Sequence, residues 1–185
     1  PPRHDVGGDE HAVAPRLEPV ERLRPLVLAA VAVDALGRDR VALEEVRQAK
    51  VDGIVVGHCD VSEPATIDAA FQAVEAAWGS LDFIVHAIAF SDKDQLDGRY
   101  VHTTAHNFTK TMLISCYSFT AVAQRAEKLM KNGGSMLTLT YYGSEQWMPP
   151  YNVMGLAKAA LECSVGYLAA DPDQPVQVID VRDLA

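Results

Sequence analysis

Two tyrosines and a lysine in the segment 141–158 could act together chemically. Tyr151 and Lys158 are seven residues apart, nearly two turns of a helix with 3.6 residues per turn, so both side chains are expected on one helix face. A phenol can donate a proton, and a nearby ammonium group can hold a ligand and lower the pKa of that phenol. Together with Tyr141, which follows an apolar run, this pair indicates an oxidoreductase site.

An ordinary helix is the alternative interpretation of the same pair. A half-buried phenol and a solvated ammonium group can share a helix without any function, and the Tyr–Lys spacing by itself is weak evidence. Tyr141 could likewise be an aromatic residue at a strand end, where tyrosine is frequent.

The elements that must position these residues alternate between strand-like and helix-like patterns. Short apolar runs predict strands at residues 51–57, 81–87, 136–140 and 176–181. Helical periodicity predicts helices at residues 65–78, 107–130 and 151–170, with a polar loop over residues 90–106. This alternation is typical of right-handed crossovers and a parallel sheet, and predicts a Rossmann-like, doubly wound α/β fold in a single domain.

Local signals mark the first of these helices. Ser62 is expected to cap its N-terminus, Pro64 lies in its first turn, and Gly79 is the expected stop.

Residues that directly follow a predicted strand should converge. In open parallel sheets, ligands bind beyond the carboxyl ends of the strands. Asp60, residues 88–91 and Tyr141 all stand in that position and are expected to line one crevice.

Composition narrows the class of protein. The length of 185 residues suits one domain, and the net charge of −9 disfavours non-specific nucleic-acid binding. The sequence contains no apolar stretch of about 18 residues, so we expect no membrane span, and it begins without the pattern of a secretory signal. Three widely spaced cysteines argue against a disulfide framework and favour a reducing, cytoplasmic setting.

A metal site is the alternative for one motif. His58, Cys59 and Asp60 are potential ligands, but no second Cys/His cluster stands at ligand spacing, so we expect no metal.

Four motifs in order resemble a known family. They are HCDV at 58–61, HAIAFS at 86–91, TLTYYG at 138–143 and YNVMGLAKAALE at 151–162. They are similar to the bacterial NADH-dependent enoyl-acyl-carrier-protein reductases, divergent members of the short-chain dehydrogenase/reductase superfamily. The resemblance runs from about residue 57 to 170, and the seven-residue Tyr–Lys spacing separates these enzymes from ordinary members, which use four.

The resemblance implies a role for each matching residue. Tyr151 would hydrogen-bond the thioester carbonyl of a trans-2-enoyl substrate and stabilise the enolate formed when hydride from NADH attacks C3. Tyr141 matches the second active-site tyrosine, and Lys158 would hold the nicotinamide ribose hydroxyls. Ser91 would lie at the substrate position, and Met154 would line the acyl pocket.

The same resemblance implies cofactor contacts and partners. Asp60 would accept from the adenine amino group, with Val61 against the ring and Ile88 near the cofactor. The substrate would be linked to acyl carrier protein, in fatty-acid elongation. The protein would be a homotetramer whose main interface is formed by the helices at 107–130 and 151–170.

Both ends depart from the family. Residues 1–50 show no glycine-rich pyrophosphate turn, since Gly7-Gly8 is followed by two acidic residues, and residues 26–33 could be a strand or a buried helix. Ala89 replaces a glycine, and residues 171–185 lack the expected substrate-binding helix. The ends could reflect divergence, truncation or an out-of-frame reading. The rival functions are a non-catalytic α/β domain unable to bind the dinucleotide, or a superfamily reductase with another carbonyl substrate.

Overall fold

The computed structural model describes residues 56–170 and 176–179. Its strands are β1 (Phe83–His86), β2 (Gly134–Thr138) and β3 (Val176–Ile179). Its helices are α2 (Pro64–Trp78), α3 (Ala105–Met112), α4 (Ser118–Leu129) and α5 (Asn152–Ala169), with a π-helical segment, Leu113–Tyr117, between α3 and α4. Short 3₁₀ turns occupy Lys93–Gln95, Tyr100–His102 and Tyr142–Ser144.

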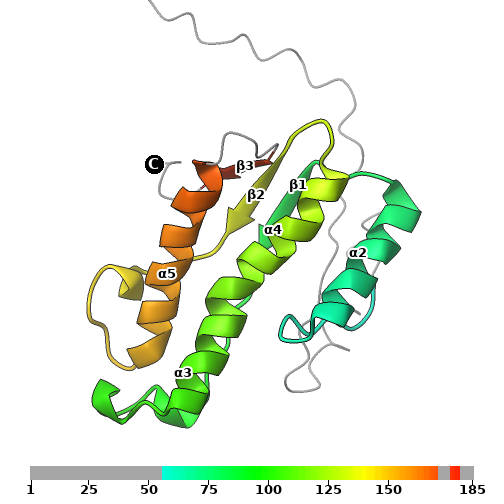
Figure 1. The fold of residues 1–185 in the computed structure, drawn as a ribbon. Coiled ribbons are helices and arrows are strands. Elements are labelled where there is room, and N and C mark those ends of the chain that lie inside the picture. Colours follow the sequence, from blue (N-terminus) through cyan, green and yellow to red (C-terminus); the bar gives the residue numbers. More distant parts are fainter. Residues whose placement is uncertain (1–55, 171–175, 180–185) are drawn as a thin grey trace, which may run out of the picture.

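The strands form one parallel sheet in the order β1-β2-β3. Phe83 pairs with Ser135 in the first ladder, and Gly134 pairs with Val176 in the second. This arrangement, with a helix between successive strands, confirms the predicted parallel α/β fold (Figure 1).

The described helices cover one face of the sheet. Figure 1 shows α4 and α5 lying across the strands, with α2 beside α4. Met136 of β2 is fully buried against α4 and α5, whereas Phe83 and Val85 of β1 point the other way and are 44% and 46% exposed. The described residues therefore show helices on one face of the sheet.

Helix α2 begins one residue earlier than predicted. Pro64 occupies its first turn and Gly79, at φ 72°, ends it, both as expected. The predicted cap was wrong: the N-cap residue is Glu63, without a side-chain cap bond. The N–H and hydroxyl of Ser62 instead both donate to the Asp60 carboxylate, so Ser62 is occupied one step before the helix.

The long helix predicted at 107–130 is interrupted. The N–H of Ser118 bonds to the Leu113 carbonyl five residues back, which is the π-helical pattern. The helix also starts two residues early, because the Thr104 hydroxyl accepts from the Asn107 N–H and caps α3.

Other boundaries shift by a few residues. The strand predicted at 136–140 is Gly134–Thr138, and the helix predicted at 151–170 begins after Tyr151. Val56 and Gly57, the described part of the predicted strand 51–57, are not in a strand. The remaining predictions for residues 1–55, 171–175 and 180–185 lie outside the described residues.

Two apolar clusters hold the helices on the sheet. One joins α4, α5 and β2 around Phe119, Met136 and Leu161, all fully buried. The other lies under the start of α2 and includes Val61 and Ile67.

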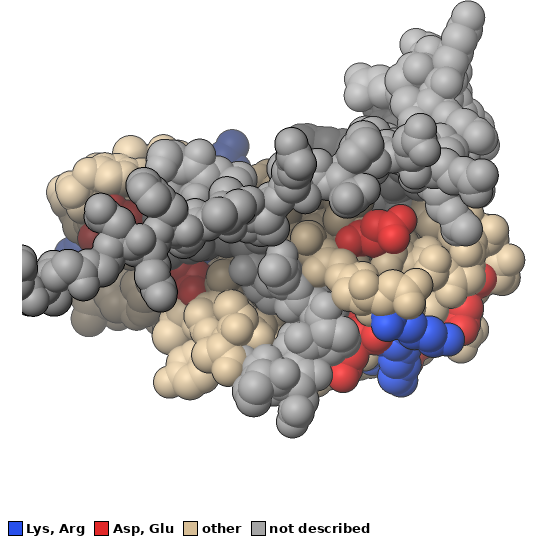
Figure 2. Space-filling view, turned by 90° about the horizontal axis from the view of Figure 1, so that it is seen from above, with Lys and Arg blue, Asp and Glu red and all other residues tan. Residues whose placement is uncertain are grey.

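The surface of the described part carries charges of both signs. Figure 2 shows basic side chains grouped beside acidic ones at one edge of the face in view, among uncharged residues. Within residues 56–170, no helix combines the length and apolar character that a bilayer crossing requires. No group of three His, Cys, Asp or Glu side chains in that range could hold a metal ion.

Candidate active site

The two tyrosines of the motif meet beyond the end of β2. The ring centroids of Tyr141 and Tyr151 are 4.9 Å apart, with the planes tilted by 57°. Tyr141 is 48% exposed, and Tyr151 is partly buried. The sequence analysis put both residues in one candidate oxidoreductase site, and the structure brings their rings into contact.

Tyr151 stands at the entry to α5. The sequence analysis expected Tyr151 inside the helix, on one face with Lys158. The helix begins one residue later, at Asn152, and Tyr151 is its N-cap residue. The next residue, Asn152, has a positive φ of 35°, a conformation that asparagine tolerates better than most residues. Its side-chain Nδ2 donates to the Leu96 carbonyl at 2.7 Å, which ties the start of α5 to the loop before α3.

Two glycines allow the turn after β2 to approach Tyr151. A Cβ on Gly143 would lie 2.4 Å from Cδ1 of the Tyr151 ring. A Cβ on Gly155 would lie 2.7 Å from the Gly143 carbonyl oxygen. The backbone of the turn and the tyrosine ring are therefore packed together with no room for a side chain.

Lys158 is buried, with 5% of its surface exposed. Its Nζ donates to the Leu139 carbonyl at 2.7 Å, just beyond β2. Burial lowers the pKa of this ammonium group, while Cys116 and Glu162 oppose that effect. The interpretation of Lys158 as a solvated surface lysine is excluded by this position.

The pKa of Tyr151 is raised, not lowered as the spacing argument predicted. Burial is the main cause, followed by the neighbouring Tyr141. Lys158 is directed at the Leu139 carbonyl and does not reverse this effect. The phenol is therefore neutral at physiological pH and can act as a hydrogen-bond donor.

Asp60 is held in a well-defined orientation. Its Oδ1 accepts from the N–H of Ser62 at 2.8 Å and from the hydroxyl at 2.6 Å. The hydroxyl bond is the largest cause of its lowered pKa, so the carboxylate is ionised. Val61, beside it, is 3% exposed and packs into the cluster under α2, on which Ile88 also rests.

Ser91 belongs to a polar cluster rather than standing alone. Its hydroxyl accepts from Asn107 Nδ2 at 3.1 Å and from the Thr111 hydroxyl at 2.9 Å. The next residue, Asp92, pairs with Lys110 at 2.6 Å. The loop after β1 is thus fastened to α3, which the sequence analysis did not foresee.

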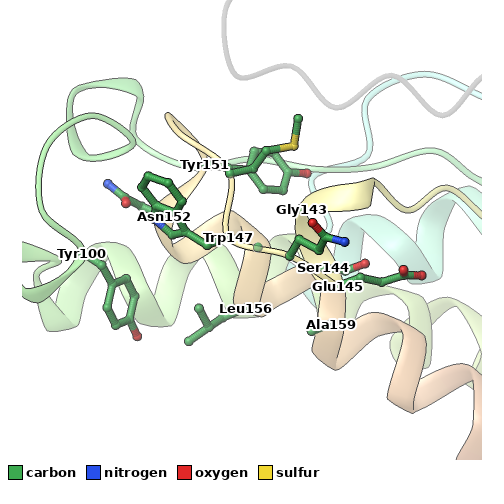
Figure 3. Close-up of a pocket in the computed structure, with 12 residues that line it drawn as sticks. Tyr100, Gly143, Ser144, Glu145, Trp147, Tyr151, Asn152, Leu156 and Ala159 are labelled. Atoms are coloured by element: carbon green, nitrogen blue, oxygen red, sulfur yellow. The ribbon is translucent and has the colours of Figure 1, made fainter.

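A cavity of about 370 Å³ opens beside Tyr151. Figure 3 shows its wall formed by Tyr100, the turn from Gly143 to Trp147, and the first two turns of α5 with Leu156 and Ala159. Met154, expected in an acyl pocket, is 6% exposed and is not part of this wall.

Two residues of the site were given no role by the sequence analysis. His86, 2% exposed, bonds Thr138 at 3.1 Å and Ser118 at 2.8 Å. Glu162 accepts from the hydroxyls of Thr140 and Ser144. Glu162 had a signal in the sequence, because it stands four residues after Lys158 and therefore on the same helix face.

Comparison with known proteins gives a consistent result. A family model described as "Enoyl-(Acyl carrier protein) reductase" matches residues 27–177. The chain is 64% identical over 122 residues to an enoyl-[acyl-carrier-protein] reductase [NADH] of Rhizobium meliloti (strain 1021), an alignment covering 66% of this chain and 45% of that protein. It is 53% identical over 116 residues to the same kind of reductase from Rickettsia conorii, covering 63% and 45%. The match therefore spans less than half the length of these curated relatives.

Solved structures agree. The reductase of Anaplasma phagocytophilum, in complex with NAD, is 49% identical with a TM-score of 0.69, covering 82% of this chain and 56% of that one. The NADH reductase of Aquifex aeolicus is 37% identical with a TM-score of 0.72, covering 81% and 60%. These matches confirm the Rossmann-like fold.

Proposed function

Because the chain belongs to the family of enoyl-(acyl carrier protein) reductases, we propose that it reduces the trans-2 double bond of an enoyl thioester carried by acyl carrier protein, with NADH as cofactor, in fatty-acid elongation. The observation that carries this proposal is the contact of the Tyr141 and Tyr151 rings beyond the end of β2, beside a buried Lys158.

Tyr151 is the proposed donor to the substrate carbonyl. Hydride addition to a conjugated thioester builds negative charge on the carbonyl oxygen, and a preorganised phenol stabilises that charge. The raised pKa of Tyr151 keeps its proton in place, and the packing against Gly143 fixes the ring before substrate arrives. The ring of Tyr141 packs against this ring, at a centroid distance of 4.9 Å.

Two described residues fit the cofactor that the family uses. The Asp60 carboxylate is ionised and partly exposed, and its Oδ2 takes part in neither bond to Ser62, so it can accept from an adenine amino group. Lys158 uses one N–H on Leu139 and keeps two for ribose hydroxyls. A reduced nicotinamide, when bound, supplies the hydride; the residues of this chain orient it and hold the carbonyl oxygen.

The substrate-side roles of the other residues are part of the proposal. Ser91 is held on α3 and can present its loop backbone to a thioester. Met154 is buried, and we assign it to the acyl pocket. Ile88 packs against the apolar cluster that contains Val61, so these two residues would line the cofactor site, with Val61 against the adenine.

The test is NADH oxidation by the purified chain with a trans-2-enoyl thioester, beside two matched variants. Tyr151→Phe removes the proposed donor and is expected to lower kcat about 10²-fold, the usual effect of losing one oxyanion donor. Tyr142→Phe removes the same hydroxyl from a neighbouring, 54% exposed tyrosine and should leave kcat unchanged. No turnover from a folded sample would instead favour the non-catalytic domain.

We include a homotetramer in the proposal. Large apolar side chains stand exposed along the helices expected at the interface: Phe108, Tyr117, Leu156 and Tyr167, at 37%, 50%, 42% and 79% exposure. Contiguous exposed apolar surface is typical of protein interfaces. A stable monomer in sedimentation would contradict this assembly.

A cytoplasmic location completes the proposal. The three cysteines, Cys59, Cys116 and Cys163, are all free thiols, as is usual in a reducing compartment. Cell fractionation that recovers the protein outside the cytoplasm would contradict it.

A further inference from the structure

Glu162 connects α5 to the segment that carries Tyr141. Its Oε1 accepts from the hydroxyls of Thr140 and Ser144. Thr140 stands directly before Tyr141, and Ser144 is the last residue of the turn Tyr142–Ser144. One carboxylate oxygen thus fastens both ends of the segment 140–144 to the helix.

Lys158 adds a third attachment from the same helix. Its Nζ holds the Leu139 carbonyl, the residue directly before Thr140. Lys158 and Glu162 are four residues apart, one turn of α5, and lie on the same side of it. The chain leaving β2 is therefore fixed to α5 at residues 139, 140 and 144.

Small movements of this turn would reach the Tyr151 ring. Gly143 lies inside the fastened segment, and a Cβ there would stand 2.4 Å from the ring, so backbone and ring are already in close contact. Tyr141, also inside the segment, contacts the same ring. Loss of the Glu162 hydrogen bonds would therefore change the packing around Tyr151, although Glu162 itself is not part of that packing.

Glu162 also acts on the charge of Lys158. Burial lowers the pKa of that ammonium group, and the negative charge of Glu162 opposes the effect. The other titratable groups that interact with Lys158 are Cys116, from the π-helical segment, and His86, from β1. Of these, Glu162 is the carboxylate one helical turn away.

We propose that Glu162 is a positioning residue: its carboxylate holds the Tyr141 turn against Tyr151, although it contacts neither substrate nor cofactor. This role in catalysis rests on the proposed reductase function. The positioning itself can be measured without turnover.

Three changes separate the hydrogen bonds of Glu162 from its negative charge. Glu162→Gln keeps an acceptor oxygen but loses the charge. Glu162→Ala loses both. The double variant Thr140→Val, Ser144→Ala removes the donors and leaves the charge. Glu127→Gln, at an exposed position of α4, is the matched control.

The measurements that need no turnover come first. The N–H groups of Ser144 and Glu145 bond to the Tyr141 and Tyr142 carbonyls. Amide exchange of both residues should accelerate at least tenfold in Glu162→Ala, and that of Glu145 should do so in the double variant. The pKa of Lys158, followed by NMR of its side chain, should fall in Glu162→Gln and Glu162→Ala but not in the double variant. Glu127→Gln should change neither.

Turnover then tests the catalytic consequence. We expect kcat to fall at least tenfold in Glu162→Ala and in the double variant. We expect the alkaline limit of activity to move to lower pH in Glu162→Gln, with kcat at neutral pH within about threefold of the parent chain. If Glu162→Ala does not fold, the other two variants carry the test.

Two results would overturn the proposal: unchanged amide exchange in both Glu162→Ala and the double variant, or faster exchange in these variants with unaltered turnover. An inactive parent chain that still shows the exchange and pKa changes would contradict the reductase function and leave the positioning role intact.

Discussion

Replacing His86 by glutamine should remove a large part of the acid sensitivity of folding. The His86 ring is buried between Thr138 and Ser118, and its edge meets the Phe119 ring at a centroid distance of 5.3 Å. Burial, followed by the positive charge of Lys158, lowers the pKa of His86 to about 4 from its ordinary 6.5. Glutamine can bond the same hydroxyls but does not titrate.

The magnitude follows from proton linkage. Between pH 6.5 and pH 4 the unfolded chain binds a proton at this position that the folded chain does not, so the free energy of unfolding rises with pH. The stability is fully present above pH 6.5 and is lost as the pH falls towards 4. At about 1.36 kcal/mol per pH unit, the loss is roughly 2 kcal/mol from pH 7 to pH 5, and roughly 3 kcal/mol at pH 4.

Urea unfolding of both proteins at pH 7, 6 and 5 measures this difference. Carboxylates titrate in both chains and cancel when the two curves are subtracted. The wild-type chain should lose about 2 kcal/mol more than His86→Gln between pH 7 and pH 5. Parallel curves would refute the reasoning, because they would mean that His86 binds its proton equally in the folded and unfolded states.

Further predictions concern packing. Gly143→Ala places a methyl group against the Tyr151 ring and should lower kcat/KM at least tenfold in the enoyl-thioester assay; unchanged kcat/KM would contradict the close packing. Phe119→Ala should destabilise the fold by about 3–5 kcal/mol in urea unfolding, because the side chain is fully buried in the cluster under α5; a loss below about 1 kcal/mol would contradict that burial. Gly166→Ala, at an open position of α5, should raise stability by about 0.5–1 kcal/mol in the same assay, and a loss would show that the position is crowded.

The sequence predicted the parallel α/β order, and it predicted the bounds of α2 to within one residue. Both follow from strong local signals: short apolar runs, helical periodicity, and Pro64 and Gly79 at the ends of α2. Each of these signals comes from residues close together in the chain, and hydrophobic periodicity is evaluated over such short windows.

Long-range contacts explain what was missed. The buried Lys158 ammonium group donates to the Leu139 carbonyl, nineteen residues away in the chain. The direction of the Tyr151 pKa shift depends on burial and on Tyr141. Ser62 looked like a cap because its residue type is right, but its hydroxyl is directed at the Asp60 carboxylate and the N-cap position falls one residue later, at Glu63. Roles for Ser91, Met154, Val61 and Ile88 came from resemblance and remain proposals.

The π-helical segment, Leu113–Tyr117, sets the rotation of α4 relative to α3 about the helix axis. A π turn holds about one residue more than an α turn, and one residue corresponds to roughly 100° of rotation about the helix axis. Within it, Ser115 bonds the backbone of Phe90, while Asn107 and Thr111 before it face Ser91, and Ser118 after it faces His86.

Deletion of one residue from this segment would leave a regular α-helix, but it would rotate the side chains of α4 by roughly 100° relative to those of α3. Either the Ser91 loop or the His86 strand would then lose its partners. The length of this stretch, and not only its residue types, is therefore a constraint on the sequence.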